Sequence, residues 1–166
     1  MTSAEVLAGV RDALQSITAP RLFETERGYQ GALLGQLDRR LQLPARVIVE
    51  QEYQKQAGRH GVTIRPDIII HEPFDPERFA DRTQGNVAVI ELKLRSTAAE
   101  AADDFMSLGL MLDELRYPLG IFINIGAERT WAELLPQALH GRVACFAVRL
   151  QDTAVTVVEV YQPSNS

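Results

Sequence analysis

The sequence predicts an α/β fold in which helices flank a mixed central β-sheet. Four segments carry apolar residues at helical spacing, and six runs rich in apolar and β-branched residues are typical of strands. Along the chain their order is helix, helix, three strands, helix, strand, helix and two strands. Amphipathic helices and sheets must each bury an apolar face, and helices packed against one sheet satisfy both requirements.

The N-terminal part of the chain begins with two predicted helices. Residues 3–17 place apolar side chains on one helical stripe, and Pro20 closes this segment. A second helix is expected to begin near Thr25, a candidate N-cap, and to stop at Pro44.

Three strands are expected next. Residues 46–53 and 62–71 are rich in β-branched side chains, and the glycines within residues 58–61 indicate a hairpin turn between them. Residues 72–86, with two prolines and several charges, are typical of an exposed loop. This loop leads into a third strand at residues 87–95.

The C-terminal part of the chain returns to helical spacing. Residues 98–116 trace one apolar stripe, and residues 119–125 form a continuous apolar run that predicts a buried strand. A short helix is predicted near residues 129–139. Two further strands, at residues 142–150 and 154–161, complete the sheet.

Length and composition limit the kinds of protein that this chain can be. With 166 residues, 46% hydrophobic and 23% charged, the sequence predicts one domain over residues 1–162 and a polar tail over residues 163–166. A net charge of −5 argues against a broad basic surface that coats nucleic acid, although it permits a local basic cleft. No apolar stretch approaches the roughly 20 residues of a membrane helix, so we expect a cytoplasmic protein with no membrane partner.

An acid and a base interrupt the third predicted strand. Side chains alternate along a strand, so Glu91 and Lys93 lie on one face, whereas Ile90 and Leu92 face the other way. This pattern alone is also typical of a strand that leaves the core and carries its charges on a solvated end.

Asp67 gives the charged strand a second interpretation. It lies beside the branched apolar run "III" on the strand before, and if the two strands pair, Asp67 and Glu91 approach each other. Two ionised carboxylates in a partly dry site repel unless a cation lies between them. Mg²⁺ suits such a pair because it prefers oxygen ligands and needs only one or two protein carboxylates, and we expect Mn²⁺ to substitute for it. Lys93 would orient a water or offset charge on a phosphate.

These residues give the sequence a resemblance to the PD-(D/E)XK nuclease superfamily. The matching residues are Pro66-Asp67 and Glu91-Leu92-Lys93, each beside apolar residues. The resemblance implies a restriction endonuclease-like core with the order helix, three strands, helix, strand. An extra N-terminal helix and a C-terminal helix with strands would be additions to this core.

The order of elements from about residue 24 to 125 also matches that core, and the family often adds an acid from its first helix. Glu26 fits this role better than Glu24 because it precedes an apolar stripe on the same helical face. A glutamate in a first turn is also favoured by the helix dipole, so a purely local role stays open.

The helix after the lysine strand departs from the family pattern. Where the family often presents a glutamine or other polar residue, this chain has Asp103 and Asp104. An extra acid near a phosphate would disfavour nucleic acid, but we expect the pair to form a solvated first turn. The three histidines lack the spacing of metal ligands, so no histidine metal site is predicted.

Phosphate contacts require cations or backbone N–H groups. Arg65 and Arg95 adjoin the motif residues, and Arg27, Lys55 and Arg59 lie on elements that could border the same cleft. Each is also explained as an ordinary surface charge.

The leading hypothesis is a Mg²⁺-dependent deoxyribonuclease, with Asp67, Glu91 and Glu26 as metal ligands and Lys93 as the fourth catalytic group. DNA would be its partner, and a homodimer or larger complex would supply affinity for it. The alternative is a catalytically inactive module of the same fold that binds nucleic acid or protein. A third possibility, a small-molecule enzyme with Lys93 as base, has no pocket signature in its favour.

Overall fold

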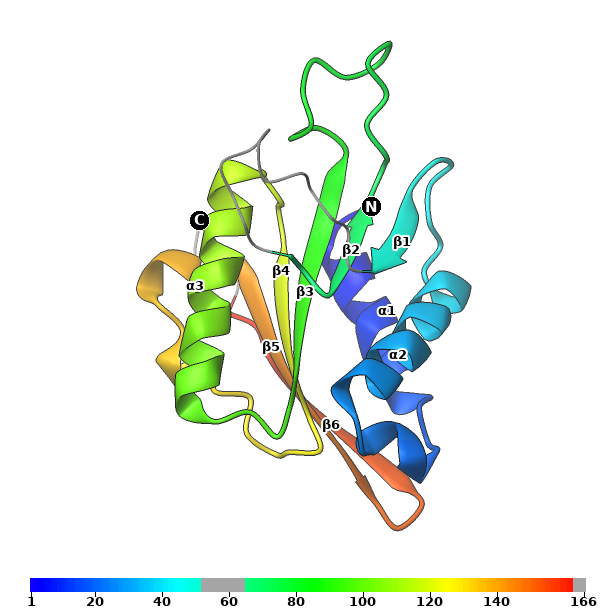
Figure 1. Cartoon of the computed structure of the whole chain (residues 1–166), viewed down its shortest axis with the longest axis vertical. Coiled ribbons are helices and arrows are strands. Elements are labelled where there is room, and N and C mark those ends of the chain that lie inside the picture. Colours follow the sequence, from blue (N-terminus) through cyan, green and yellow to red (C-terminus); the bar gives the residue numbers. More distant parts are fainter. Residues whose placement is uncertain (52–64, 163–166) are drawn as a thin grey trace.

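The computed structural model describes residues 1–51 and 65–162, and within these ranges six strands form one mixed sheet (Figure 1). The strands lie side by side in sequence order. They are β1 (Ile48–Gln51), β2 (Ile68–His71), β3 (Asn86–Leu94), β4 (Gly120–Ile125), β5 (Val143–Gln151) and β6 (Ala154–Val160). β1, β2 and β3 are antiparallel, β3, β4 and β5 are parallel, and β6 is antiparallel to β5. The predicted α/β fold with a mixed sheet is confirmed.

Helices cover both faces of the sheet and make three layers. α1 (Ser3–Gln15) and α2 (Glu26–Arg40) lie on one side, and α3 (Ala98–Glu114) lies on the other (Figure 1). Ile90 and Leu92 of β3 pack in the cluster that contains the apolar residues of α1 and α2. Val89 of the same strand packs with Phe105 of α3 in a second cluster. The alternation expected for this strand is therefore observed.

Polar caps explain where the helices begin. Thr25 accepts a hydrogen bond from the Gly28 N–H at 3.1 Å and is the N-cap of α2, as predicted. At the start of α3, Thr97 and Glu100 form a reciprocal capping box. These local signals fix the first turns of the two helices that approach the charged end of β3.

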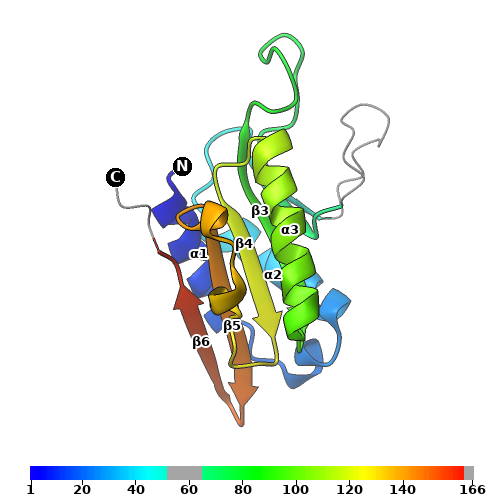
Figure 2. The ribbon, with the colours of Figure 1, turned by 90° about the vertical axis from the view of Figure 1, so that its left-hand side faces the viewer.

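The parallel part of the sheet arises from a crossover connection. Parallel neighbours need a long link, and α3 provides it between β3 and β4. Figure 2 shows α3 running alongside these two strands. None of the helices in the part of the chain that the structure describes is long and apolar enough to cross a membrane.

The predicted helix at residues 129–139 is wrong. Two short 3₁₀ turns occupy this segment, at Ala132–Leu134 and Gln137–Leu139. Pro136 lies between them, and a proline interrupts a helix because it lacks an N–H and its ring clashes with the preceding turn.

The second strand of the predicted hairpin begins later than expected. β2 starts at Ile68, so Pro66 and Asp67 lie immediately before the strand instead of within it. The hairpin turn at 58–61, together with Lys55 and Arg59, lies outside the described residues. The tail at 163–166 lies outside them as well.

Candidate active site

Within residues 1–51 and 65–162, the short length of β2 leaves part of one edge of β3 without a strand partner. Pairing between the two strands reaches Ile68 opposite Ile90 and goes no further, although β3 continues to Leu94. Carboxylates take the place of the missing strand. The Leu92 N–H donates to Asp67 Oδ2 at 2.8 Å. Because a strand's backbone donors must find acceptors, this edge attracts acidic side chains.

The second carboxylate on this edge comes from α2. The Leu94 N–H donates to Glu26 Oε2 at 3.1 Å. One turn further along α2, the buried side chain of Gln30 donates to the backbone carbonyl of Asp67 at 2.7 Å. The helix that carries Glu26 therefore also holds the segment that carries Asp67, and both acids converge on β3.

Glu91 lies on the α3 face of β3 and is only 5% exposed. Burial raises the pKa of this carboxyl well above its usual value, and the negative charges of Asp67 and Asp104 raise it further. A hydrogen bond to the Asp67 side chain acts in the same direction. The Asp67 carboxylate therefore lies close enough to Glu91 for its charge to raise the pKa of the Glu91 carboxyl.

Lys93 lies two residues further along the same face, and its side chain is 30% exposed. Its Nζ is 3.7 Å from Asp104 Oδ1. Burial lowers the pKa of Lys93, but attraction by the surrounding carboxylates outweighs this effect and raises the pKa above its usual value. Those carboxylates are Asp104, Glu26, Asp67 and Glu91. The lysine is consequently a charged ammonium group at neutral pH.

Asp104 corrects an expectation drawn from the sequence. Asp103 is exposed, as expected for a solvated turn, but Asp104 is only 8% exposed. Burial raises the pKa of Asp104 to about 6, with the attraction of Lys93 acting against that rise. Sequence periodicity contained the signal, since position 104 is three residues after buried Ala101 and four before buried Leu108.

The charge balance of this cluster suits a cation. Asp67, Glu91, Asp104 and Glu26 face one lysine. In the part of the chain that the structure describes, no group of three or more His, Cys, Asp or Glu side chains is arranged to hold a metal ion. The Asp67–Glu91 pair nevertheless fits a hard divalent ion such as Mg²⁺, for which one or two protein carboxylates are sufficient. An ion between them would relieve the repulsion that raises the pKa of Glu91.

The arginines predicted to contact phosphate lie around this cluster on the protein surface. Arg65 precedes Asp67 by two residues, Arg27 follows Glu26, and Arg95 follows the last residue of β3. All three are exposed. The structure therefore leaves all three at the surface, within two residues in sequence of members of the cluster.

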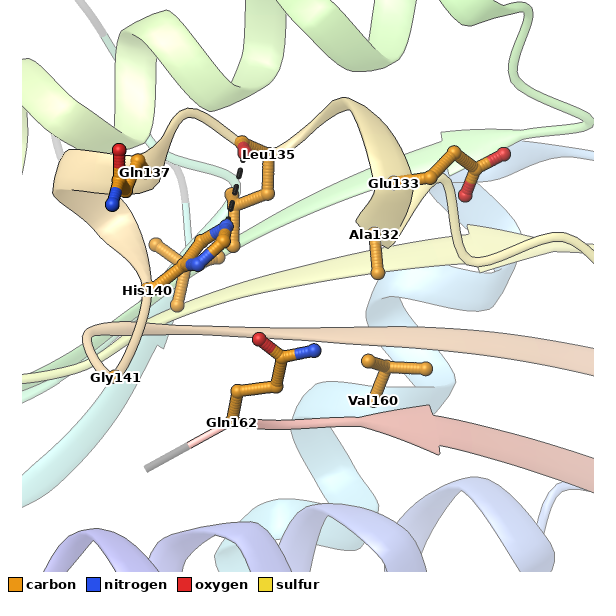
Figure 3. A pocket seen from close by; sticks show the side chains of 9 residues that line it. Ala132, Glu133, Leu135, Gln137, His140, Gly141, Val160 and Gln162 are labelled. Carbon is orange, nitrogen blue, oxygen red and sulfur yellow. Dashed lines mark hydrogen bonds between the residues drawn. The ribbon is translucent and has the colours of Figure 1, made fainter. Parts of the chain in front are cut away.

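A separate hollow of about 420 Å³ lies over the start of β5 and the end of β6 (Figure 3). His140 lines it, and its Nε2 is 3.2 Å from the Leu135 carbonyl oxygen. His71 lies elsewhere, on β2, where its Nε2 is 3.0 Å from Glu50. None of the four predicted catalytic residues lines the hollow, so it is not part of the acidic cluster.

We expect the buried acids to make the metal-free protein less stable as the pH rises. Ordinary pKa values are 3.8 for Asp and 4.5 for Glu, and the folded protein holds Asp104 at about 6 and Glu91 well above its usual value. The folded state therefore binds more protons than the unfolded state in this range, so the free energy of unfolding falls as pH rises from about 4 through 6.

Urea unfolding in EDTA at a series of pH values would measure this effect. The wild type should lose stability relative to Asp104→Asn as the pH rises across this window. Parallel pH profiles for the two proteins would contradict the assignment of a raised pKa to Asp104.

Comparisons with known proteins add little to these observations. No protein family model matches the chain, and no curated protein matches it. Among solved structures, the chain is similar to NucC of P. aeruginosa ATCC27853 in its cAAA-bound form, at 13% sequence identity and a TM-score of 0.46. The match covers 99% of this chain and 86% of that chain. The fold of this chain is α/β, with a mixed six-stranded sheet in its described residues and helices on both faces.

Proposed function

We propose that the protein is a metal-dependent nuclease that hydrolyses DNA phosphodiester bonds. The observation that carries the proposal is the position of half-buried Asp67 close to buried Glu91, with Lys93 beside them. Burying two acids close together is unfavourable, and a bound divalent cation converts this repulsion into coordination. The resemblance of the motif residues to the PD-(D/E)XK superfamily supports the same reading.

In the proposed reaction, a water oxygen bonds to phosphorus and loses a proton to the solvent. One phosphorus–oxygen ester bond breaks, and the departing oxygen takes up a proton from the solvent, which leaves a phosphate monoester and a free hydroxyl group. Asp67 and Glu91 would hold Mg²⁺, or Mn²⁺ in its place. A bound divalent ion supplies a Lewis acid that polarises a phosphoryl oxygen and lowers the pKa of its water. Lys93 would offset the negative charge that develops on the phosphate.

Glu26 would serve the same site from α2. One of its oxygens holds the Leu94 N–H, so Glu26 keeps the charged end of β3 in place. Its negative charge also contributes to the attraction for a cation, as its effect on Lys93 indicates. The three acids are not arranged around a common ion position in the described residues, so we propose that Glu26 joins Asp67 and Glu91 as the third acid when the ion binds.

DNA would approach across the exposed arginines Arg27, Arg65 and Arg95. Guanidinium groups bind phosphates and release counterions, so binding should weaken with salt. Because the whole chain carries a net charge of −5, a homodimer or a larger complex would add the affinity that one copy lacks.

A second candidate is a catalytically inactive module of the same fold. Asp67 and Glu26 already accept hydrogen bonds from backbone N–H groups of β3, which is a structural task. Lys93 lies 3.7 Å from Asp104, so the charges also form a partial ion-pair network. Such a module would bind nucleic acid or protein without cleaving it.

Cleavage assays on the full chain separate the two candidates. Supercoiled DNA, linear DNA and RNA are incubated with Mg²⁺, with Mn²⁺ or with EDTA. We expect metal-dependent cleavage of DNA by the wild type and a loss of about 100-fold or more in Asp67→Asn. Asparagine retains an oxygen that can accept from the Leu92 N–H, so the fold is expected to persist.

Glu24→Gln is the matched control for the acidic residues, because Glu24 is exposed and precedes the α2 cap. It should cleave as the wild type does. If the wild type cleaves no nucleic acid with either metal, the nuclease proposal is wrong and the module is favoured.

A further inference from the structure

Asp104 reaches the charged end of β3 from α3, whereas Asp67 and Glu26 bind backbone N–H groups along one edge of that strand. We propose that Asp104 is a positioning residue of the same site. It holds the Lys93 ammonium group toward α3, so that the lysine does not neutralise the Asp67–Glu91 pair. This inference rests on the proposed nuclease function and adds a residue that neither the motif nor the resemblance identifies.

The positions of the charges on β3 explain why Lys93 needs an anion on the α3 side to hold it. Glu91 and Lys93 share one face of β3 and are only two residues apart. A lysine on a flexible stem would fold toward the adjacent carboxylates and compete with a divalent ion for them. Asp104 offers a competing anion, with its Oδ1 3.7 Å from the Lys93 Nζ. Among the neighbouring carboxylates, Asp104 attracts the Lys93 ammonium group most strongly.

Asp104 can hold this position because α3 is fixed at its start. The Ser96 N–H, just before the helix, donates to Asn124 Oδ1 at 2.8 Å. Asn124 is 1% exposed and lies opposite Lys93 in the β3–β4 register. Its Nδ2 donates to the Arg129 carbonyl at 2.8 Å, so this side chain ties the helix start to the loop after β4.

Core packing fixes the next part of the helix. Phe105 of α3 packs edge-on against Phe122 of β4, with ring centroids 5.2 Å apart. Asp104 immediately precedes this buried aromatic residue. The rotation of α3 about its axis is thereby set, and it directs the Asp104 side chain to the sheet.

The second carboxylate oxygen of Asp104 indicates that this residue does more than stabilise the fold. Among the described residues, Asp104 Oδ2 is buried and has no hydrogen-bond partner. A buried carboxylate oxygen without a partner costs stability, so an acid kept only for packing would be expected to have both oxygens satisfied. Its one recorded ion pair is with Lys93.

Steady-state kinetics with a double-mutant cycle test the role of Asp104. The proteins are the wild type, Asp104→Asn, Lys93→Met, the double variant, and Asp103→Asn as the matched exposed control. We expect Asp104→Asn to lower kcat by about 10- to 100-fold with KM for DNA changed less than about twofold, because a misplaced group costs rate. In the Lys93→Met background, Asp104→Asn should change kcat by less than about twofold.

A second readout does not depend on cleavage. The chain contains two lysines, Lys55 and Lys93, so the ¹⁵N spectrum of side-chain NH₃⁺ groups contains at most two lysine signals. The Lys55→Arg variant retains only the Lys93 signal and so assigns it, and ¹⁵N relaxation then measures the mobility of that group. We expect Asp104→Asn to lower the order parameter of the Lys93 ammonium group, whereas Asp103→Asn leaves it unchanged. The backbone amide spectra of both variants verify that the fold is intact.

The outcomes distinguish this inference from the function on which it rests. If the wild type cleaves DNA but Asp104→Asn matches Asp103→Asn in kcat and in lysine mobility, the inference is overturned and the nuclease function stands. An equal effect of Asp104→Asn with and without Lys93 would also overturn it. If the wild type does not cleave, the proposed function fails and this role of Asp104 fails with it.

Discussion

Glu91→Gln should abolish metal-dependent cleavage and leave the metal-free protein at least as stable as the wild type. Glu91 is 5% exposed, and its pKa is raised by burial and by the charges of Asp67 and Asp104. Glutamine has nearly the same shape, carries no charge, and can donate a hydrogen bond to the Asp67 carboxylate. The substitution removes repulsion without creating a cavity, so its effect on stability is neutral or favourable.

The same change removes a carboxylate from the proposed metal site. We expect the cleavage rate to fall by about a thousandfold or more, because stabilisation of the transition-state charge is lost. Saturating metal should stabilise the wild type by about 2.7 kcal/mol at a concentration 100 times Kd. It should not stabilise Glu91→Gln.

Thermal unfolding at pH 8 with and without Mn²⁺, together with the DNA cleavage assay, measures both effects. Glu24→Gln, at an exposed glutamate, is the control and should behave as the wild type in each assay. A Glu91→Gln protein that still cleaves, or that is still stabilised by metal, would show that Glu91 is not a ligand.

Lys93→Met should also slow cleavage strongly without abolishing it, but its effect on metal binding should be opposite to that of Glu91→Gln. The lysine is a charged group in contact with the acidic cluster, and methionine retains most of its apolar stem. Loss of a cation positioned at the phosphate is expected to lower the rate by about 100- to 1,000-fold. Removing a positive charge from the cluster strengthens its attraction for a divalent ion, so metal-induced stabilisation should persist or increase.

Stability gives this prediction a third observable. Without Lys93, Asp104 loses its recorded ion pair while it stays buried. The metal-free variant should therefore be less stable than the wild type. The difference in the free energy of unfolding should widen above pH 6, because Asp104 of the wild type is then ionised and paired with Lys93, whereas a buried Asp104 carboxylate in the variant has no such partner. Isothermal titration with Mn²⁺ and urea unfolding at pH 5 and pH 8 provide the measurements. Wild-type cleavage by Lys93→Met would remove the lysine from the mechanism.

Most of the secondary structure could be predicted because its signals are local. Thr25 caps α2 as expected, and the apolar stripe of residues 98–116 corresponds to α3, Ala98–Glu114. The prediction of a helix at 129–139 was wrong because it gave the spacing of apolar residues more weight than Pro136, which separates two 3₁₀ turns. A proline at that position favours interruption over a continuous helix.

The candidate site was predicted in part. Strand alternation placed Glu91 and Lys93 on one face of β3. The closeness of Asp67 to Glu91 follows from the pairing of Ile68, the next residue after Asp67, with Ile90. Asp104 was missed because two adjacent aspartates at the start of a helix are usually solvated. The spacing of position 104 from Ala101 and Leu108 favoured the buried face of the helix, and the packing of α3 on the sheet leaves Asp104 buried and Asp103 exposed.

The sequence by itself determined the elements, their order and the faces on which side chains lie, because helix and strand periods depend on neighbouring residues alone. It also determined the presence of two acids and a lysine at the ends of adjacent strands. Only the tertiary structure decided that β2 begins at Ile68, so that Asp67 and Glu26, instead of a strand, accept hydrogen bonds from N–H groups of β3. Strand register and helix rotation arise from packing between distant segments, and short-range patterns do not encode them.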